Sequence, residues 1–343
     1  MLDVVSSLVS TFDAEFGPAQ LQPVTGDASG RSYFRVVSAS CTHTYILMVL
    51  GQSAGNEELG EGGIPEELPF VYVQRLMAQV GVPVPAIYAH DEARGLMILE
   101  DFGDTTLFHW QQGRPAEEVE ARYQQALDIL ALLQVHGTPQ VNPKGQVGRA
   151  SFGETLFRAE LEHYVEFGLE RRFRPLAAED RAILDRAFPP VCAELAALPR
   201  VLVHRDYHSR NLMVYGDHLG VIDFQDALMG PGAYDLVSLL CDAYVPMDEA
   251  RVDRLLSYFM NQVRKLGGDL GPGEQFRRSF DLCTLQRCLK AAGRFEFFWF
   301  TRGNDRYLPD IPNCITNVRR ALQAQPDLAP VWEVFARYEP AFR

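Results

Sequence analysis

Three oxygen-bearing side chains are spaced so that two could hold a metal ion and one could act on a hydroxyl group. Asp206 and Asn211 lie five residues apart after an apolar segment, and Asp223 follows a second one, Gly220-Val221-Ile222. Magnesium prefers hard oxygen ligands, and phosphoryl transfer needs a carboxylate directed at the acceptor hydroxyl. We therefore predict that Asp206 is the catalytic base and that Asn211 and Asp223 hold Mg²⁺.

The first two side chains belong to a recognisable motif. His204-Arg-Asp206, four further residues and Asn211 reproduce the H-R-D-x-x-x-x-N spacing of a kinase catalytic loop. Its single parts are common at turns, but the full order of strand, motif, hairpin and Asp223 is much harder to reach by chance. We expect His204 to support the loop by hydrogen bonding, while His208 fits the acceptor site and a solvated loop position equally well.

The elements that must position these residues fall into two parts. Segments rich in aromatic and β-branched residues predict strands at 32–37, 45–50, 86–89 and 96–99, with helices over 1–20 and 66–80. Beyond residue 101 helical periodicity dominates, interrupted by a short β-rich island around the motif. The predicted helices are 115–136, 154–172, 179–197, 248–266 and 276–300. We predict an α+β protein with a sheet-containing N-lobe at 1–100 and a helical C-lobe at 101–343 that carries the catalytic loop and the acceptor site.

Composition limits the partners. The formal charge of −13 disfavours nucleic acid, and no apolar run is long enough to cross a membrane. The six cysteines show no CxxC pair, which is typical of reduced thiols packed as small apolar side chains. We expect a cytoplasmic protein that works as a monomer on a small molecule.

The motif segments resemble the aminoglycoside and choline kinase superfamily. The resemblance is carried by residues 204–211, 221–226 and 230–236. It implies a two-lobed, protein-kinase-like fold that uses ATP and Mg²⁺, with Asp206 as the base and Asn211 and Asp223 at the metal. It also implies that Asp235 supports the metal-binding loop from outside.

The nucleotide site is predicted from two segments of the N-lobe. Small residues in the turn at 26–32 would let the backbone at Ser29 and Gly30 approach phosphates, although an ordinary hairpin turn has the same composition. Glu100 falls where a kinase hinge would bind adenine through the backbone.

One departure from the superfamily concerns the phosphate-binding lysine of the third strand. Met48 stands near that position, and the first 143 residues contain no lysine. We predict that Arg31 or Arg35 supplies the positive charge instead, since a guanidinium binds phosphate in bidentate geometry. The alternative is that the metal neutralises the phosphates alone.

A finer resemblance concerns the acceptor. Nearly the whole chain is similar to the anomeric sugar kinases of bacterial cell-wall recycling, through residues 27–35, 202–207, 223–227, 285–287 and 306–312. The resemblance implies that the acceptor is the 1-hydroxyl of N-acetylmuramate or N-acetylglucosamine.

Candidate acceptor contacts follow from helical spacing. Arg287, Lys290 and Arg294 recur every three to four residues and could present a cationic face to an anionic sugar, or form a solvated helix face. We name Arg287 and His208 as acceptor residues. Further candidates for sugar hydroxyls are Glu160, Glu162 and His163, whereas the aromatic residues at 295–300 suit a core better than a stacking platform.

Three other functions remain open at this stage. The chain could phosphorylate an aminoglycoside, choline, homoserine or methylthioribose. The missing lysine also permits a catalytically silent, pseudokinase-like binding protein. A metal-dependent hydrolase is a weaker alternative, because further His and Asp ligands are absent near Asp206 and Asp223.

Overall fold

The N-terminal part of the computed structural model is an antiparallel sheet with the strand order β1-β2-β3-β5-β4. The structure describes residues 1–24, 31–50 and 67–342. The strands are β1 (Gln20–Val24), β2 (Ser32–Val37), β3 (Tyr45–Val49), β4 (Ile87–Asp91) and β5 (Leu96–Glu100). The strands predicted at 32–37, 45–50, 86–89 and 96–99 are thus confirmed to within two residues.

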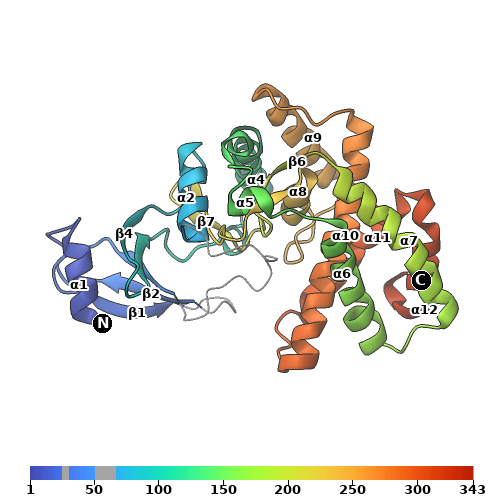
Figure 1. Ribbon diagram of the computed structural model, residues 1–343, viewed down its shortest axis with the longest axis horizontal. Helices are drawn as coiled ribbons and strands as arrows, with labels where there is room; N and C mark the ends of the chain where they lie inside the picture. Colours follow the sequence, from blue (N-terminus) through green and yellow to red (C-terminus); the bar gives the residue numbers. More distant parts are fainter. Residues whose placement is uncertain (25–30, 51–66, 343) are drawn as a thin grey trace.

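Helices cover both faces of this sheet (Figure 1). Alternate strand residues point to opposite faces, so Leu47 packs with Val9 of α1 (Leu2–Ser10), whereas Met48 packs with Val73 of α2 (Pro69–Gln79). The predicted helix over 1–20 is shorter than expected, because the chain leaves α1 after Ser10 and enters β1 at Gln20.

The remainder of the chain is mainly helical and lies at the other end of the molecule (Figure 1). Its helices are α3 (Leu107–Trp110), α4 (Ala116–Leu132), α5 (Gln146–Arg149), α6 (Glu154–Tyr164), α7 (Ala178–Ala197), α8 (Ala233–Leu240), α9 (Glu249–Lys265), α10 (Gly273–Arg302), α11 (Ile311–Gln323) and α12 (Ala329–Tyr338). Short π-helical segments continue α4 and α6, at Leu133–Gly137 and Val165–Arg171. The five predicted helices of this part are confirmed, and the α+β fold with a larger helical part is as predicted.

Two short strand pairs hold the motif within the helical part. β6 (Arg200–Val203) pairs with β9 (Leu228–Pro231), and β7 (Leu212–Tyr215) forms a hairpin with β8 (His218–Val221). The segment after β5 docks on this hairpin: Val214 donates a hydrogen bond of 2.7 Å to Thr105, and a side chain at Gly220 would clash with the Phe102 ring. The hairpin is therefore fixed against the chain that leaves the sheet.

Two expectations from composition can be compared with the fold. All six cysteines are free thiols and five are buried, as expected of small apolar side chains. Within the ranges that the structure describes, none of the helices combines the length and apolarity needed to traverse a bilayer.

Candidate active site

Residues 204–211 form a loop between β6 and β7, and a buried carboxylate from α8 anchors it. Asp235 is fully buried and accepts backbone hydrogen bonds from His204 and Arg205, at 2.6 and 2.9 Å. Arg205 has a φ of 80°, a left-handed conformation that is costly for a residue other than glycine and needs such support. Burial raises the pKa of Asp235 to about 6, although the two backbone N–H donors favour its charged form.

The anchoring role of Asp235 gives a stability prediction. Asp235→Asn keeps the volume but replaces one acceptor oxygen by an amide donor, so one buried N–H of the loop loses its partner. We expect the free energy of unfolding to fall by about 1–3 kcal/mol, measured as a lower urea midpoint with unchanged slope. Asp327→Asn, which removes an exposed ion pair with Arg278, is the control and should change stability by less than about 1 kcal/mol. Equal stability of the two variants would contradict an anchoring role.

His204 ties the loop to the end of the hairpin. Its Nε2 lies 2.9 Å from the carbonyl of Ile222, and its Nδ1 lies 3.3 Å from the backbone N–H of Asp206. A carbonyl can only accept and an N–H can only donate, so the two contacts select the neutral Nε2–H tautomer. His204 therefore faces the loop backbone and not the cavity described below.

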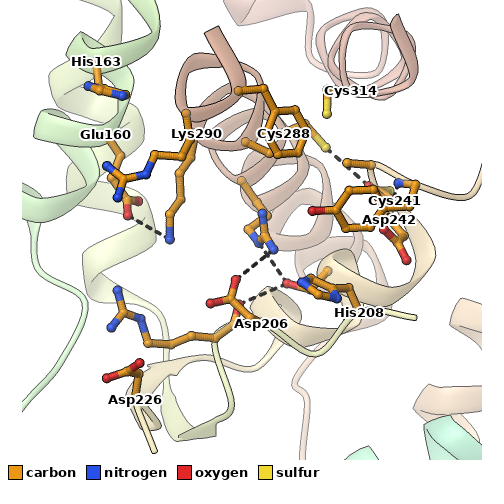
Figure 2. Close-up of a pocket in the computed structure, with 18 of the residues that line it drawn as sticks. Glu160, His163, Asp206, His208, Asp226, Cys241, Asp242, Cys288, Lys290 and Cys314 are labelled. Carbon is orange, nitrogen blue, oxygen red and sulfur yellow. Dashed lines mark hydrogen bonds and ion pairs between the residues drawn. The ribbon is translucent and has the colours of Figure 1, made fainter. Parts of the chain in front are cut away.

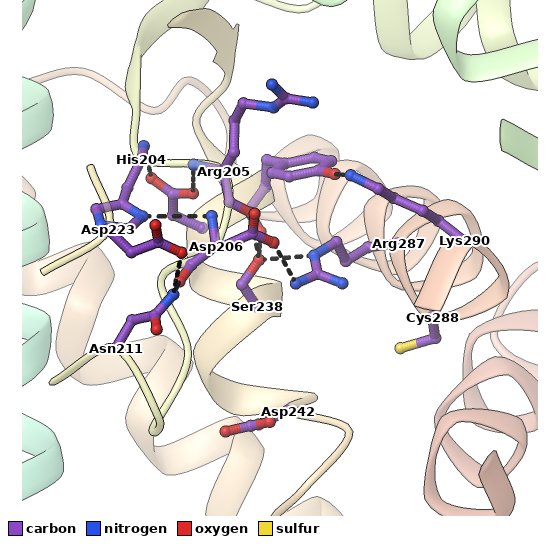
Figure 3. A network of polar contacts seen from close by, with 12 residues as sticks. His204, Arg205, Asp206, Asn211, Asp223, Ser238, Asp242, Arg287, Cys288 and Lys290 are labelled. Carbon is purple, nitrogen blue, oxygen red and sulfur yellow. Dashed lines mark hydrogen bonds and ion pairs between the residues drawn. The ribbon is translucent and has the colours of Figure 1, made fainter. Parts of the chain in front are cut away.

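Asn211 links the backbone of Asp206 to the carboxylate of Asp223, as Figure 3 shows. Its amide nitrogen donates to the Asp206 carbonyl at 3.0 Å and to the Asp223 carboxylate at 3.3 Å. Asp223 has a φ of 63° and receives a second hydrogen bond, of 2.9 Å, from Gln225. The structure thus brings Asp206, Asn211 and Asp223 together at one end of the hairpin.

Asn211 and Asp223 fit a magnesium ion. Both carry the hard oxygen atoms that this ion prefers, and they lie close enough to share it. In the part of the chain that the structure describes, no group of three His, Cys, Asp or Glu side chains forms a metal site. An ion held here would complete its coordination with phosphate and water, as magnesium usually does in nucleotide sites.

Asp206 is held by a distant helix. Arg287 of α10 donates to its carboxylate at 3.2 Å and also to Ser238 of α8 at 3.0 Å. The Arg287 side chain is only 12% exposed, whereas that of Asp206 is 44% exposed. Burial alone would raise the pKa of Asp206, but the charges of Arg287 and Lys290 outweigh burial and hold that pKa well below its usual range. The carboxylate is thus ionised, oriented and accessible.

A cavity of about 540 Å³ opens beside Asp206 (Figure 2). α10 and α6, which pack along each other, form two adjoining walls, and the floor is the loop at 204–211 with the residues that follow α8. The lining polar and aromatic residues used below are Glu160, His163, Asp206, His208, Ser238, Asp242, Tyr244, Arg287, Lys290, Arg294 and Phe295.

The cationic residues of α10 face this cavity. Arg287, Lys290 and Arg294 all line it, so the alternative of a solvated helix face does not hold for Arg287 and Lys290, whereas Arg294 is exposed to solvent at its edge. Lys290 forms an ion pair of 3.1 Å with Glu160 across the cavity. Glu162 does not line the cavity and instead pairs with two arginines of α6 and α7.

His208 also lines the cavity. Its Nδ1 is buried and has no hydrogen-bond partner within the described residues, and burial lowers its pKa. A neutral imidazole there can accept or donate a hydrogen bond to a bound molecule. The aromatic run divides: Phe295 is buried at the cavity, but Trp299 and Phe300 are 42% and 43% exposed, so the expectation of a core is wrong for these two.

Of the predicted phosphate-binding residues in the turn at 26–32 and in β2, the structure describes Arg31 and Arg35. Ser29 and Gly30 lie outside the described residues. Arg35 is bound by Asp101 at 2.5 Å and by Asp104 at 2.9 Å, so its charge is already neutralised and the arrangement does not support a phosphate contact. This guanidinium instead fastens β2 to the segment after β5.

Arg31 is the remaining candidate for the missing lysine. It hydrogen-bonds to Tyr33, whose pKa is raised by burial and by the charge of Asp223 and lowered by Arg31, so Tyr33 lies within electrostatic range of Asp223. Tyr33 pairs with Met48 on β3, the strand where the lysine would stand, and Met48 is fully buried. Glu100 accepts a hydrogen bond of 3.1 Å from the Ala86 backbone and so fixes β4 against β5.

One supporting residue was missed by sequence reasoning. Asp242 is buried and accepts hydrogen bonds from the backbone and the hydroxyl of Ser209, at 2.9 and 2.5 Å. It thereby holds the second half of the catalytic loop, as Asp235 holds the first. The available signal was a second aspartate seven residues after Asp235, or two helical turns on the same face of an apolar segment.

Comparison with known proteins decides the family. Residues 20–267 match the phosphotransferase enzyme family, which is more than half of the chain. This chain belongs to the phosphotransferase enzyme family. It is therefore an enzyme of the kinase type, and the superfamily resemblance is confirmed.

Two curated relatives of this phosphotransferase carry the same name. It is 34% identical over 324 residues to the N-acetylmuramate/N-acetylglucosamine kinase of Pseudomonas aeruginosa, covering 94% of this chain and 89% of that protein. It is 32% identical over 333 residues to the kinase of that name from Pseudomonas putida, covering 96% and 91%. Among solved structures, an amicoumacin kinase in complex with AMP-PNP and Ca²⁺ shares the fold, with a TM-score of 0.60, 14% identity and 95% and 94% coverage.

Proposed function

We propose that this phosphotransferase moves the γ-phosphate of ATP, with Mg²⁺ as cofactor, to the anomeric hydroxyl of N-acetylmuramate and N-acetylglucosamine. The observation that carries the proposal is the similarity to sugar kinases over about nine tenths of their length, combined with a polar cavity directly beside Asp206. ATP and recycled cell-wall sugars both occur in the cytoplasm, where we propose that the monomeric enzyme works.

The electrostatics of Asp206 favour an acidic hydroxyl as acceptor. A carboxylate whose pKa is held low by Arg287 and Lys290 is a weak base, and proton transfer to it from an ordinary alcohol is unfavourable. An anomeric hydroxyl is more acidic than an alcohol and gives up its proton more readily. In this proposal Asp206 orients the hydroxyl toward the γ-phosphate and accepts its proton, while the new O–P bond forms and the bond between the γ-phosphorus and ADP breaks.

The nucleotide side of the proposal rests on the motif and the sheet. Asn211 and Asp223 would hold Mg²⁺, which neutralises phosphate charge when bound. Arg31 would add positive charge from the position just before β2, while the backbone of Ser29 and Gly30 and the hinge at Glu100 would contact phosphate and adenine. Arg35 has no place in this contact, because Asp101 and Asp104 bind it.

The Glu160–Lys290 pair suits the acceptor ring. A carboxylate that accepts and an ammonium that donates stand side by side in the cavity, at 3.1 Å, and together can satisfy sugar hydroxyls and an acetamido group. His208 adds a neutral imidazole near Asp206. The lining therefore fits a polar ring better than the trimethylammonium group of choline.

A substrate panel tests the proposed function. ADP release would be measured with N-acetylmuramate, N-acetylglucosamine, choline, homoserine, methylthioribose and kanamycin, with and without Mg²⁺. We expect Mg²⁺-dependent release with the two amino sugars and phosphate on the anomeric oxygen of the product. If ADP were released with one of the other four compounds but with neither amino sugar, that compound would be the acceptor instead. Absence of release with every compound would favour the pseudokinase alternative.

Arg287 gives a pH prediction. Asp206 must be ionised to accept a proton, so activity falls as the pH drops through its pKa. Arg287→Ala removes the nearest positive charge, raises that pKa, and should move the acid limb of the kcat/KM profile up by roughly one pH unit or more. Arg287→Lys retains the positive charge, so the acid limb of its kcat/KM profile should lie close to that of wild type. An unmoved limb in Arg287→Ala would show that other charges determine the pKa.

A further inference from the structure

Three cations line one side of the acceptor cavity, but their partners differ. Arg287 contacts Asp206 at 3.2 Å, and Lys290 contacts Glu160 at 3.1 Å, so each of these positive charges is matched by a carboxylate. Arg294 lies one further turn along α10 and also lines the cavity. Within the described residues Arg294 forms no ion pair, so its positive charge, unlike those of Arg287 and Lys290, is not neutralised by a carboxylate.

The surroundings of Arg294 hold its guanidinium in place without neutralising it. Its central carbon lies 5.1 Å from the ring centre of Phe297 and 4.9 Å from that of Phe298. A guanidinium stacked on aromatic rings is restrained, yet its N–H groups lie in its own plane and stay available for bidentate binding of an anion. Arg294 is exposed to solvent, which places this donor at the mouth of the cavity.

His163 of α6 completes the same end of the cavity. Figure 2 shows it on the side remote from Asp206, beyond Glu160 and Lys290. Its Nε2 is buried and lacks a hydrogen-bond partner among the described residues. Burial and the charge of Arg294 both lower its pKa, so the imidazole is neutral and offers a hydrogen bond without adding charge.

The distances along α10 match a substituted sugar ring. Seven residues separate Arg287 from Arg294, which corresponds to about 10 Å along the helix. A pyranose whose anomeric hydroxyl meets Asp206 would lie against the Glu160–Lys290 pair and direct a substituent of its far side toward Arg294. An acidic substituent at that place would meet a positive charge that no protein carboxylate has neutralised.

We propose that Arg294, with His163 beside it, binds the carboxylate of an acidic acceptor, the lactyl ether of N-acetylmuramate, and so gives this sugar preference over neutral N-acetylglucosamine. The inference rests on the proposed function, because it assumes that both amino sugars bind with C1 at Asp206. It assigns to Arg294 the specificity of the site and no part in the chemical step.

The test compares both sugars as substrates of matched variants. Arg294→Gln should lower kcat/KM for N-acetylmuramate by roughly ten- to hundredfold, mainly through a higher KM, because a charged hydrogen bond remote from the reacting atoms is lost. For N-acetylglucosamine the change should stay within about twofold of wild type. Arg294→Lys keeps the charge and should recover part of the preference, and His163→Ala should reduce it in the same direction.

Arg302→Gln is the control. Arg302 lies on the same helix and also stacks on Phe298, at 5.1 Å, but it does not line the cavity. It should leave both kcat/KM values unchanged. The inference is overturned if Arg294→Gln affects both sugars equally or neither, or if wild type accepts only the neutral sugar. If wild type phosphorylates neither sugar, the proposed acceptor fails first, and the inference fails with it.

Discussion

Asp206→Asn should lower kcat for N-acetylmuramate by about 10²–10⁴-fold, because an amide can neither accept the proton nor orient the hydroxyl as a carboxylate does. The loop should keep its shape, since Asp206 contributes to it through its backbone: the N–H donates to His204 and the carbonyl accepts from Asn211. Its side chain is 44% exposed, and within the described ranges Arg287 is the residue that donates a hydrogen bond to its carboxylate. The variant therefore separates chemistry from folding.

Three measurements complete this experiment. The thermal midpoint and the affinity for the non-hydrolysable nucleotide AMP-PNP should remain close to wild type, while single-turnover phosphoryl transfer is lost. Asp217→Asn, an exposed position at the tip of the β7–β8 hairpin whose backbone carbonyl alone is used, is the control and should retain full activity. If Asp206→Asn kept more than about a tenth of wild-type kcat, another group would have to serve as base.

The sequence was sufficient for features that depend on short stretches of chain. The strand segments are rich in aromatic and β-branched or other apolar residues over four to six positions, and the motif places Asp206 and Asn211 on one loop. A hairpin of two short strands then returns Asp223 to the same point. Each step depends on local spacing, so the three residues could be predicted to meet without knowledge of the remaining fold.

Contacts between distant helices could not be predicted in the same way. Arg287 and Asp206 are 81 positions apart, and Lys290 and Glu160 meet only because α10 packs along α6. Periodicity showed that the cations of α10 share a face, but not whether solvent or a cavity lies in front of it. Arg35 was wrongly predicted to bind phosphate for a similar reason. Its ion pairs with Asp101 and Asp104 form only because β2 lies beside the chain after β5, which the sequence does not reveal.

The catalytic loop combines backbone strain with buried support. Arg205 and Asp223 both adopt left-handed backbone conformations, which cost of the order of 1–3 kcal/mol each for residues other than glycine. Asp235 holds the first of them by accepting its N–H, and Asn211 and Gln225 hold the carboxylate of the second. This backbone conformation directs the carboxylates of Asp206 and Asp223 toward one place. Asp235 and Gln225, which take no part in the proposed chemistry, help to keep them there.

Asp223→Asn should lower kcat/KM by about 10²–10³-fold, because it removes the one formal negative charge of the pair that would hold Mg²⁺, and such an ion contributes several kcal/mol to phosphoryl transfer. Asparagine is the informative replacement, since at a φ of 63° it is tolerated better than alanine and so leaves the backbone undisturbed. The direct readout is nucleotide binding by calorimetry at a series of Mg²⁺ concentrations. Mg²⁺ should strengthen AMP-PNP binding to wild type and to Asp217→Asn but not to Asp223→Asn. An equal Mg²⁺ effect in all three proteins would mean that the metal is held elsewhere.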